Sequence, residues 1–304
     1  MKDYEFLSKS TILNNRYKIE ELVGYGGYVT TYKAYDNETG ETVVINEFFS
    51  DALAHRNGET NIIIPINESE YYKVLERYSA EIKKLFSLKD IKGIIGFIDI
   101  FEGNNTLYAV KRHIDYIKLI NYIKQEGGKL DCDEALAIIM SLIDTLKSIH
   151  NKKIIHRNIS PNEIWLCEGV DVRLTGNDSI YFLDKTVQIE QGMAVIFNST
   201  YGCAPIEVYK INALQGTWTD IYALCATFYY MITGVVPDES VNRIIEDNVK
   251  SPKELDDSIP EYISNAIMKG MELDYKKRFQ NVEELEGVLK NKKVVRYKKH
   301  KIKL

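Results

Sequence analysis

The sequence predicts an α+β fold in which a small β-rich lobe with one long helix precedes a larger, mainly α-helical lobe. Residues 16–50 combine β-branched and aromatic residues with glycine-rich turns, which is typical of strands. From about Asp115 onwards the apolar residues recur at helical spacing instead. A chain of 304 residues suits one large domain or two tightly joined lobes.

The first lobe is predicted to contain several strands around one helix. Residues 16–23 alternate loosely, a glycine-rich break follows, and residues 29–36 resume a β-rich stretch. Residues 37–40 form a hairpin turn before a strand at 41–49. A helix is predicted over 69–88, since one face collects the apolar side chains of Tyr71, Leu75, Tyr78, Ile82 and Leu85. Two further strands are predicted at 94–102 and 105–112.

Helical periodicity dominates the second lobe. One apolar stripe consists of Leu136, Ile139, Leu142, Leu146 and Ile149. A second strong helix begins near Thr219 and ends at a glycine. The predicted division is therefore a first lobe at 1–113, a second lobe at 114–290 and a basic tail at 291–304.

Composition excludes several classes of protein. A net charge of −5 gives no general reason to expect nucleic acid as a partner. The four cysteines lack any C-x-x-C pair, which argues against a metal site and favours reduced, buried thiols. Neither an apolar run of about 18 residues nor the apolar core of a signal peptide is present, so the expected location is cytoplasmic.

Seven segments, taken in order, resemble the protein kinase fold and are most similar to bacterial Ser/Thr kinases. They correspond to the glycine-rich loop, the V-A-I-K strand, the H-R-D catalytic loop, the D-F-G triplet, the A-P-E segment, the central helix of the large lobe and a late K-R-F segment, at residues 24–34, 43–49, 154–166, 172–178, 201–207, 218–234 and 276–285. The resemblance covers about residues 11 to 290. It implies a bilobal protein kinase-like fold, whereas function must be argued from the site.

The resemblance places unusual residues at the catalytic positions. Asn46 occupies the V-A-I-K lysine position, and Asn158 occupies the catalytic aspartate position. A neutral amide can neither clamp phosphates as a cation nor accept a proton as a carboxylate does. Glu163 stands at the metal-binding asparagine, and Gly176 stands at the D-F-G aspartate. We therefore expect a pseudokinase that is not an enzyme.

The same resemblance suggests that the adenine pocket is filled. Val29 replaces the third glycine of the loop, and Thr31 and Val44 stand above the adenine. Trp165 stands at the floor, where it is expected either to plug the pocket or to pack into the core elsewhere. Lys111 occupies the gatekeeper position, with a side chain that reaches either the back of the cleft or solvent.

Glu81 matches the helix glutamate whose usual partner is the V-A-I-K lysine. Because Asn46 cannot pair with it, two outcomes remain open: an ion pair between Glu81 and Lys111, or an exposed Glu81 on a displaced helix. Residues that support the fold are kept. They are His156, Arg157 and Asp220, together with Glu207 and Arg278, which the resemblance pairs with each other.

The expected function is that of a scaffold or allosteric regulator in bacterial signalling, bound to a protein partner such as an active kinase or its substrate. Two alternatives stay open. One is a nucleotide sensor without turnover, and the other is a residual Ser/Thr kinase-like enzyme that uses Glu163 and Asp178 on a metal. No cofactor, resident metal or nucleic acid is expected.

The tail at 291–304 contains seven Lys or Arg residues and no acidic residue. Such a charge run is usually solvated. The alternatives are contact with an anionic membrane at the inner face of the cell and contact with an acidic partner.

Weak membrane contact predicts salt-sensitive binding to anionic vesicles. Salt screens the attraction between the seven cationic side chains and the anionic vesicles. Co-sedimentation should therefore fall steeply between low salt and about 0.5 M salt. Neutral vesicles serve as the control. Lack of binding to anionic vesicles at low salt would leave only the solvated interpretation or an acidic protein.

Overall fold

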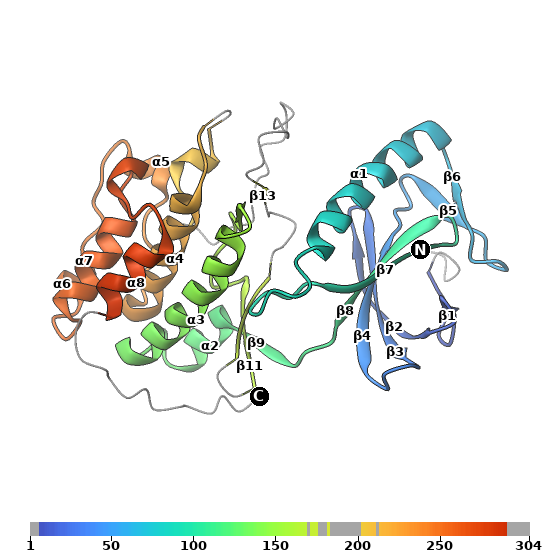
Figure 1. Cartoon of the computed structure of the whole chain (residues 1–304), viewed down its shortest axis with the longest axis horizontal. Coiled ribbons are helices and arrows are strands. Elements are labelled where there is room, and N and C mark those ends of the chain that lie inside the picture. Colours follow the sequence, from blue (N-terminus) through green and yellow to red (C-terminus); the bar gives the residue numbers. More distant parts are fainter. Residues whose placement is uncertain (1–5, 169–170, 176–180, 183–201, 211–212, 291–304) are drawn as a thin grey trace. The chain divides into compact units, whose positions relative to one another are not determined.

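The computed structural model describes residues 6–168, 171–175, 181–182, 202–210 and 213–290 (Figure 1). The chain divides into two compact units. The first unit contains residues 1–90 and 95–114, and the second contains residues 91–94 and 115–304. The border between the two units follows residue 114, and the predicted border follows residue 113. Residues 91–94 also belong to the second unit. A sheet-rich first unit and a helical second unit confirm the predicted α+β class.

A six-stranded antiparallel sheet forms the body of the first unit. In spatial order its strands are β1 (Ile12–Leu13), β2 (Tyr17–Gly26), β3 (Val29–Asp36), β4 (Thr42–Phe48), β8 (Thr106–Arg112) and β7 (Phe97–Gly103). Alternation along these strands gives the sheet two distinct faces. The register places Asn46 opposite Thr31 on one side and Ala109 on the other, so these three residues share a face.

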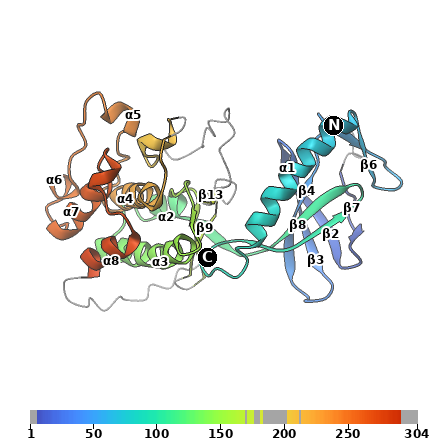
Figure 2. The same ribbon diagram turned by 45° about the horizontal axis from the view of Figure 1, so that its top comes forward.

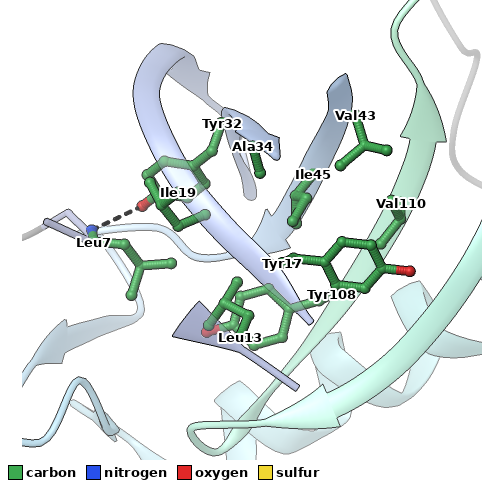
Figure 3. Packing of buried hydrophobic residues seen from close by; sticks show 10 residues of the cluster. All are labelled: Leu7, Leu13, Tyr17, Ile19, Tyr32, Ala34, Val43, Ile45, Tyr108 and Val110. Atoms are coloured by element: carbon green, nitrogen blue, oxygen red, sulfur yellow. Dashed lines mark hydrogen bonds between the residues drawn. The ribbon is translucent and has the colours of Figure 1, made fainter. Parts of the chain in front are cut away.

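The opposite face of this sheet carries the larger core. Its buried side chains come from β2, β3, β4 and β8, and Leu7 and Leu13 of the N-terminal segment complete it (Figure 3). Tyr17, Tyr32 and Tyr108 are fully buried within the unit. Three aromatic rings in one small core bury much apolar area, but each hydroxyl then needs a hydrogen-bond partner.

A short hairpin that the sequence pattern did not predict follows β4. It consists of β5 (Ala54–Arg56) and β6 (Ile63–Pro65). The side chains of Arg56 and Glu47 are both fully buried and lie 2.6 Å apart. Burial works against the charged form of Arg56, but the attraction of the Glu47 carboxylate outweighs it and raises the pKa of Arg56. This ion pair fixes the hairpin to the sheet.

Helix α1 (Glu68–Phe86) packs against β7 and β8 within the first unit (Figure 1). It begins at Asn67, whose side chain accepts a hydrogen bond from the backbone N–H of Glu70. Acidic residues in its first turn and lysines in its last turn complement the helix dipole. Of the predicted apolar face, Tyr71, Ile82 and Leu85 are buried.

The second unit is mainly helical (Figure 2). Its helices are α2 (Leu119–Gln125), α3 (Cys132–His150), α4 (Thr217–Thr233), α5 (Ser240–Arg243), α6 (Pro252–Leu255), α7 (Glu261–Gly270) and α8 (Val282–Lys290). Its short strands are β9 (Tyr116–Lys118), β10 (Ile154–Ile155), β11 (Ile164–Cys167), β12 (Val172–Leu174) and β13 (Tyr181–Phe182). Within the described residues, no helix is long and apolar enough to cross a membrane.

Helix α4 is the central helix of the second unit, packed against α3, α6 and α7. Nearly all of its residues are buried, and most of them are apolar. It ends at Gly234, whose φ of 71° lies in the left-handed region. A Cβ there would lie 2.9 Å from the carbonyl oxygen of Gly128, so only glycine ends the helix without strain.

A buried ion pair joins two distant parts of the second unit. The Arg278 guanidinium donates to both carboxylate oxygens of Glu207, over 2.6 Å and 3.1 Å. Both side chains are almost completely excluded from solvent. Arg278 also donates to the backbone carbonyls of Trp218, Glu272 and Leu273, so its charge is distributed over several acceptors.

Loss of Arg278 should strongly destabilise the fold. Arg278→Ala leaves the Glu207 carboxylate buried without its cation, and we expect a loss of about 3–5 kcal/mol in the free energy of unfolding. Urea denaturation followed by circular dichroism measures this loss. Arg173→Ala, which removes a partly exposed pair with Asp171, is the control and should change stability by about 1 kcal/mol or less. Equal effects of the two variants would contradict the assignment.

Candidate active site

The catalytic-loop segment is held by one buried carboxylate of α4. Asp220 accepts hydrogen bonds from the backbone N–H groups of His156 and Arg157, over 2.8 Å and 2.7 Å. The Nε2 atom of His150 lies 2.8 Å from the same carboxylate. Burial alone would raise the pKa of Asp220, but His150 and the backbone donors hold it below its usual value. The charge of Asp220 is therefore stabilised by donors from two other segments.

Arg157 has a left-handed backbone conformation, with φ of 69°. For a residue other than glycine this conformation costs about 1–3 kcal/mol unless the surroundings impose it. The hydrogen bond from its N–H to Asp220 is one such constraint. The backbone of His156 and Arg157 is thus held in place by Asp220.

Three residues of this loop present polar atoms. The backbone N–H of Asn158 donates to Nδ1 of His156 over 3.3 Å. The Oδ1 atom of Asn158 and the hydroxyl of Ser160 are buried and have no hydrogen-bond partner among the described residues. The Glu163 carboxylate accepts a hydrogen bond of 2.8 Å from the Thr175 hydroxyl. Gly176, Asn177 and Asp178 lie outside the described residues.

The pairing of strands explains how Glu163 is oriented. The backbone N–H of Thr175 donates to the carbonyl of Glu163 over 2.8 Å, directly after the pairing of Ile164 with Leu174. This backbone bond brings the Thr175 hydroxyl beside the Glu163 carboxylate. The glutamate at the predicted metal-binding position is therefore held by its neighbouring strand.

In the first unit, Asn46 stands at the position where the resemblance places a phosphate-binding lysine, and its side-chain amide forms a local hydrogen bond. The Thr31 hydroxyl donates to Oδ1 of Asn46 over 3.3 Å. Val29 and Val44 lie on the same face of the sheet as Asn46 and are half-buried. Gly27, in the turn before Val29, has φ of 58°, which glycine tolerates. These four predicted residues are thus neighbours on one face.

Trp165 stacks on a residue that sequence reasoning missed. Its ring lies face to face with the ring of Tyr116, with centroids 3.4 Å apart and planes 2° apart. The reason is register: β11 pairs with β9 so that Trp165 faces Lys118 and Cys167 faces Tyr116, which makes the two rings diagonal neighbours. Trp165 is half-buried, and its pairing with Tyr116 lies within the second unit alone.

Of the two outcomes left open for Glu81, the structure shows an exposed side chain rather than an ion pair with Lys111. Glu81 lies on the exposed side of α1, and the Lys111 ammonium lies 4.6 Å from the ring centroid of Phe97. Strand register is again the cause, because Lys111 of β8 faces Phe97 of β7. A cation above an aromatic face is stabilised by the ring quadrupole, so Lys111 has a local alternative to Glu81.

No metal centre is formed by the part of the chain that the structure describes, since no group of three or more His, Cys, Asp or Glu side chains comes together there. The four thiols are not oxidised to disulfides. Burial raises the pKa of Cys203 and Cys225 to about 12, which keeps these thiols protonated and poorly reactive.

Comparison with known proteins identifies this arrangement. The model of the protein kinase domain matches residues 17–286, which is most of the chain. The chain belongs to the protein kinase domain family. A probable serine/threonine-protein kinase of Clostridium perfringens is 26% identical, over 91% of this chain and 38% of its own length. Serine/threonine-protein kinase PrkC of Bacillus subtilis is 23% identical, over 91% and 40%.

A solved structure named "PpkA-294 apo form" supports the same fold. It matches with a TM-score of 0.73 and 26% identity, over 94% of this chain and all of that one. The bilobal protein kinase-like fold predicted from the resemblance to bacterial Ser/Thr kinases is therefore confirmed. The chain spans about two fifths of the length of the bacterial relatives named above.

The same findings overturn one prediction. We expected a chain that is not an enzyme, because amides or glycine occupy catalytic positions. Membership of the protein kinase domain family, and relatives that are named serine/threonine-protein kinases, point to an enzyme instead. The expectation rested on the residue types at several catalytic positions taken together, and residue types alone do not measure the activity of a site.

The depressed pKa of Asp220 predicts a pH-dependent stability. A carboxylate with a folded pKa below its unfolded value of about 3.9 stabilises fully above that value, and the contribution is lost as pH falls through the folded pKa. Unfolding free energies of the wild type and Asp220→Asn should therefore differ most at neutral pH, and the difference should shrink as the pH falls through the folded pKa of Asp220. Asp144→Asn, on the exposed side of α3, is the control. A difference that does not change with pH would refute this role.

Proposed function

We propose that this domain is a Ser/Thr kinase-like enzyme with altered metal chemistry, in which Glu163 supplies a carboxylate to the cation that accompanies the nucleotide. The observation that carries the proposal is the hydrogen bond from Thr175 to the Glu163 carboxylate. It orients an acidic side chain at the position where relatives of this fold bind metal through an asparagine, by the resemblance given above.

The chemistry of the cation favours such an exchange. Mg²⁺ prefers oxygen ligands and is commonly bound by one or two carboxylates together with substrate phosphates. Glu163 adds a negative charge that an asparagine lacks, and so binds a divalent cation more strongly. A cation held there by Glu163 and the substrate phosphates would supply the charge neutralisation that phosphoryl transfer mainly requires.

The amides at Asn46 and Asn158 predict slow transfer. Proton transfer by a positioned base contributes about 10²–10⁴-fold to a rate, and Asn158 does not supply it. Asn46 supplies no cation to the phosphates. We therefore expect turnover well below the range of about 1–100 s⁻¹ that is typical of kinases.

The supporting framework is consistent with this activity. Asp220 holds the backbone of His156 and Arg157, and the ion pair of Glu207 with Arg278 anchors the segment before α4. Each of these buried charges is stabilised by several hydrogen-bond donors or acceptors. Such a network requires the loops that supply these groups to keep a precise geometry.

A protein-binding role as an allosteric regulator in bacterial signalling is the second candidate. The stack of Trp165 on Tyr116 favours it, because a rigid aromatic pair at the predicted adenine floor leaves less room for a base. The partner would be a protein, such as another kinase or its substrate. Such a regulator would not depend on ATP for its interaction.

Substitution of Glu163 tests the proposed activity. Transfer of labelled phosphate from ATP, with Mg²⁺ or Mn²⁺ and a general protein substrate, should be slow but above a heat-killed control. Glu163→Ala should reduce the rate by at least about 10-fold, since it removes a charged ligand of the cation. Glu168→Ala is the matched control, because this exposed glutamate follows β11 and has no part in the proposal.

Thr175→Val separates orientation from charge. It keeps the Glu163 carboxylate but removes the hydroxyl that holds it, so we expect a higher Mg²⁺ requirement with a smaller loss of maximal rate. Equal rates in the wild type and Glu163→Ala would reject the role of Glu163. Wild-type transfer no higher than the heat-killed control, with no thermal shift at millimolar ATP and Mg²⁺, would favour the second candidate.

A further inference from the structure

The N-terminal segment at residues 6–13 packs on the face of the first unit's sheet that lies opposite Asn46. Leu7 and Leu13 are buried in the core that β2, β3, β4 and β8 form (Figure 3). The backbone N–H of Ser10 donates to the carbonyl of Ile19, and Ile19 donates back to Thr11, both over 2.8 Å. The segment is therefore attached to β2 as well as to the core.

A buried chain of hydrogen bonds joins this segment to β4. The backbone N–H of Leu7 donates to the hydroxyl of Tyr32 over 3.2 Å, and that hydroxyl donates to Glu47 over 3.1 Å (Figure 3 shows the first of these). Glu47 also accepts from Tyr108 over 2.7 Å and pairs with Arg56. Glu47 directly follows Asn46, so the segment is linked to the strand that carries a predicted active-site residue.

The first residue of the segment contacts the glycine-rich hairpin. The Phe6 ring lies 5.1 Å from the ring of Tyr25, at an interplanar angle of 39°. The side chains of Tyr25 and Tyr28, at the hairpin tip, are about half exposed. The carbonyl of Tyr28 accepts a hydrogen bond of 3.0 Å from Phe49, and its ring lies 6.2 Å from Phe48.

The tip also has space beside it. A cavity of about 220 Å³ lies between Phe6, the tip residues Tyr25, Gly26 and Gly27, and the start of the loop after β4. No heavy atom comes within 4 Å of the places where a Cβ on Gly26 or Gly27 would lie. A weakly packed tip next to an open cavity can shift without breaking the core below it.

We propose that residues 6–13 form a strap that sets the position of the glycine-rich hairpin through the contact of Phe6 with Tyr25. The buried leucines and the bond to Tyr32 hold the strap in place, and the Phe6 ring transmits that constraint to the tip. Release of the ring lets the tip move within the cavity. The strap is thus a built-in control over the segment that, in the protein kinase family, covers the phosphates of the nucleotide.

Hydrogen exchange followed by mass spectrometry tests the strap on the full chain without any nucleotide. Phe6→Ala should make amides of residues 23–29 exchange about 2- to 10-fold faster, which is the change expected when one aromatic contact is lost. Phe6→Tyr keeps a ring and should exchange like the wild type. Ile12→Ala is the control from the same segment, because its side chain is 57% exposed.

Coupling must act in both directions, because a coupling free energy is reciprocal. Tyr25→Ala, at an exposed position, should therefore raise exchange in residues 7–11. Unchanged exchange of residues 23–29 in Phe6→Ala would overturn the proposal. Faster exchange throughout the first unit, including α1, would also overturn it, because Phe6 would then be an ordinary core residue. Since no readout involves ATP, this test stands apart from that of the proposed activity.

Discussion

The buried carboxylate of Asp220 is the constraint on which the catalytic loop depends. It lies on α4, the most buried helix of the second unit, and accepts two backbone N–H groups from a loop more than 60 residues earlier. An ionised carboxylate in such a place is stable only if hydrogen-bond donors compensate for the loss of water. The donors from His150, His156 and Arg157 meet this requirement, and the left-handed backbone of Arg157 follows from it.

The first unit solves a similar problem with Glu47. Its buried carboxylate accepts hydrogen bonds from Tyr32 and Tyr108 and forms an ion pair with Arg56. Because Tyr32 also accepts from Leu7, the N-terminal segment, the sheet and the β5–β6 hairpin share one polar network. A fully satisfied network of this kind gives the core a single arrangement, which an apolar core of equal size would specify less strictly.

Three of the residues in which this chain departs from the family pattern have partners close by. Asn46 bonds to Thr31, Glu163 bonds to Thr175, and Trp165 stacks on Tyr116. These three residues have a local partner within their own unit, whereas the buried Oδ1 atom of Asn158 has none among the described residues. The three are therefore integrated into the packing of their units.

The sequence alone determined the α+β class, the two lobes and the positions of the altered residues, because periodicity and ordered motifs are local properties of the chain. It also indicated the pairing of Glu207 with Arg278 through resemblance. Only the tertiary structure decided which side chains meet across strands. The stack of Trp165 on Tyr116 depends on strand register, which local patterns do not encode. The ammonium of Lys111 lies over Phe97 rather than beside Glu81 for the same reason.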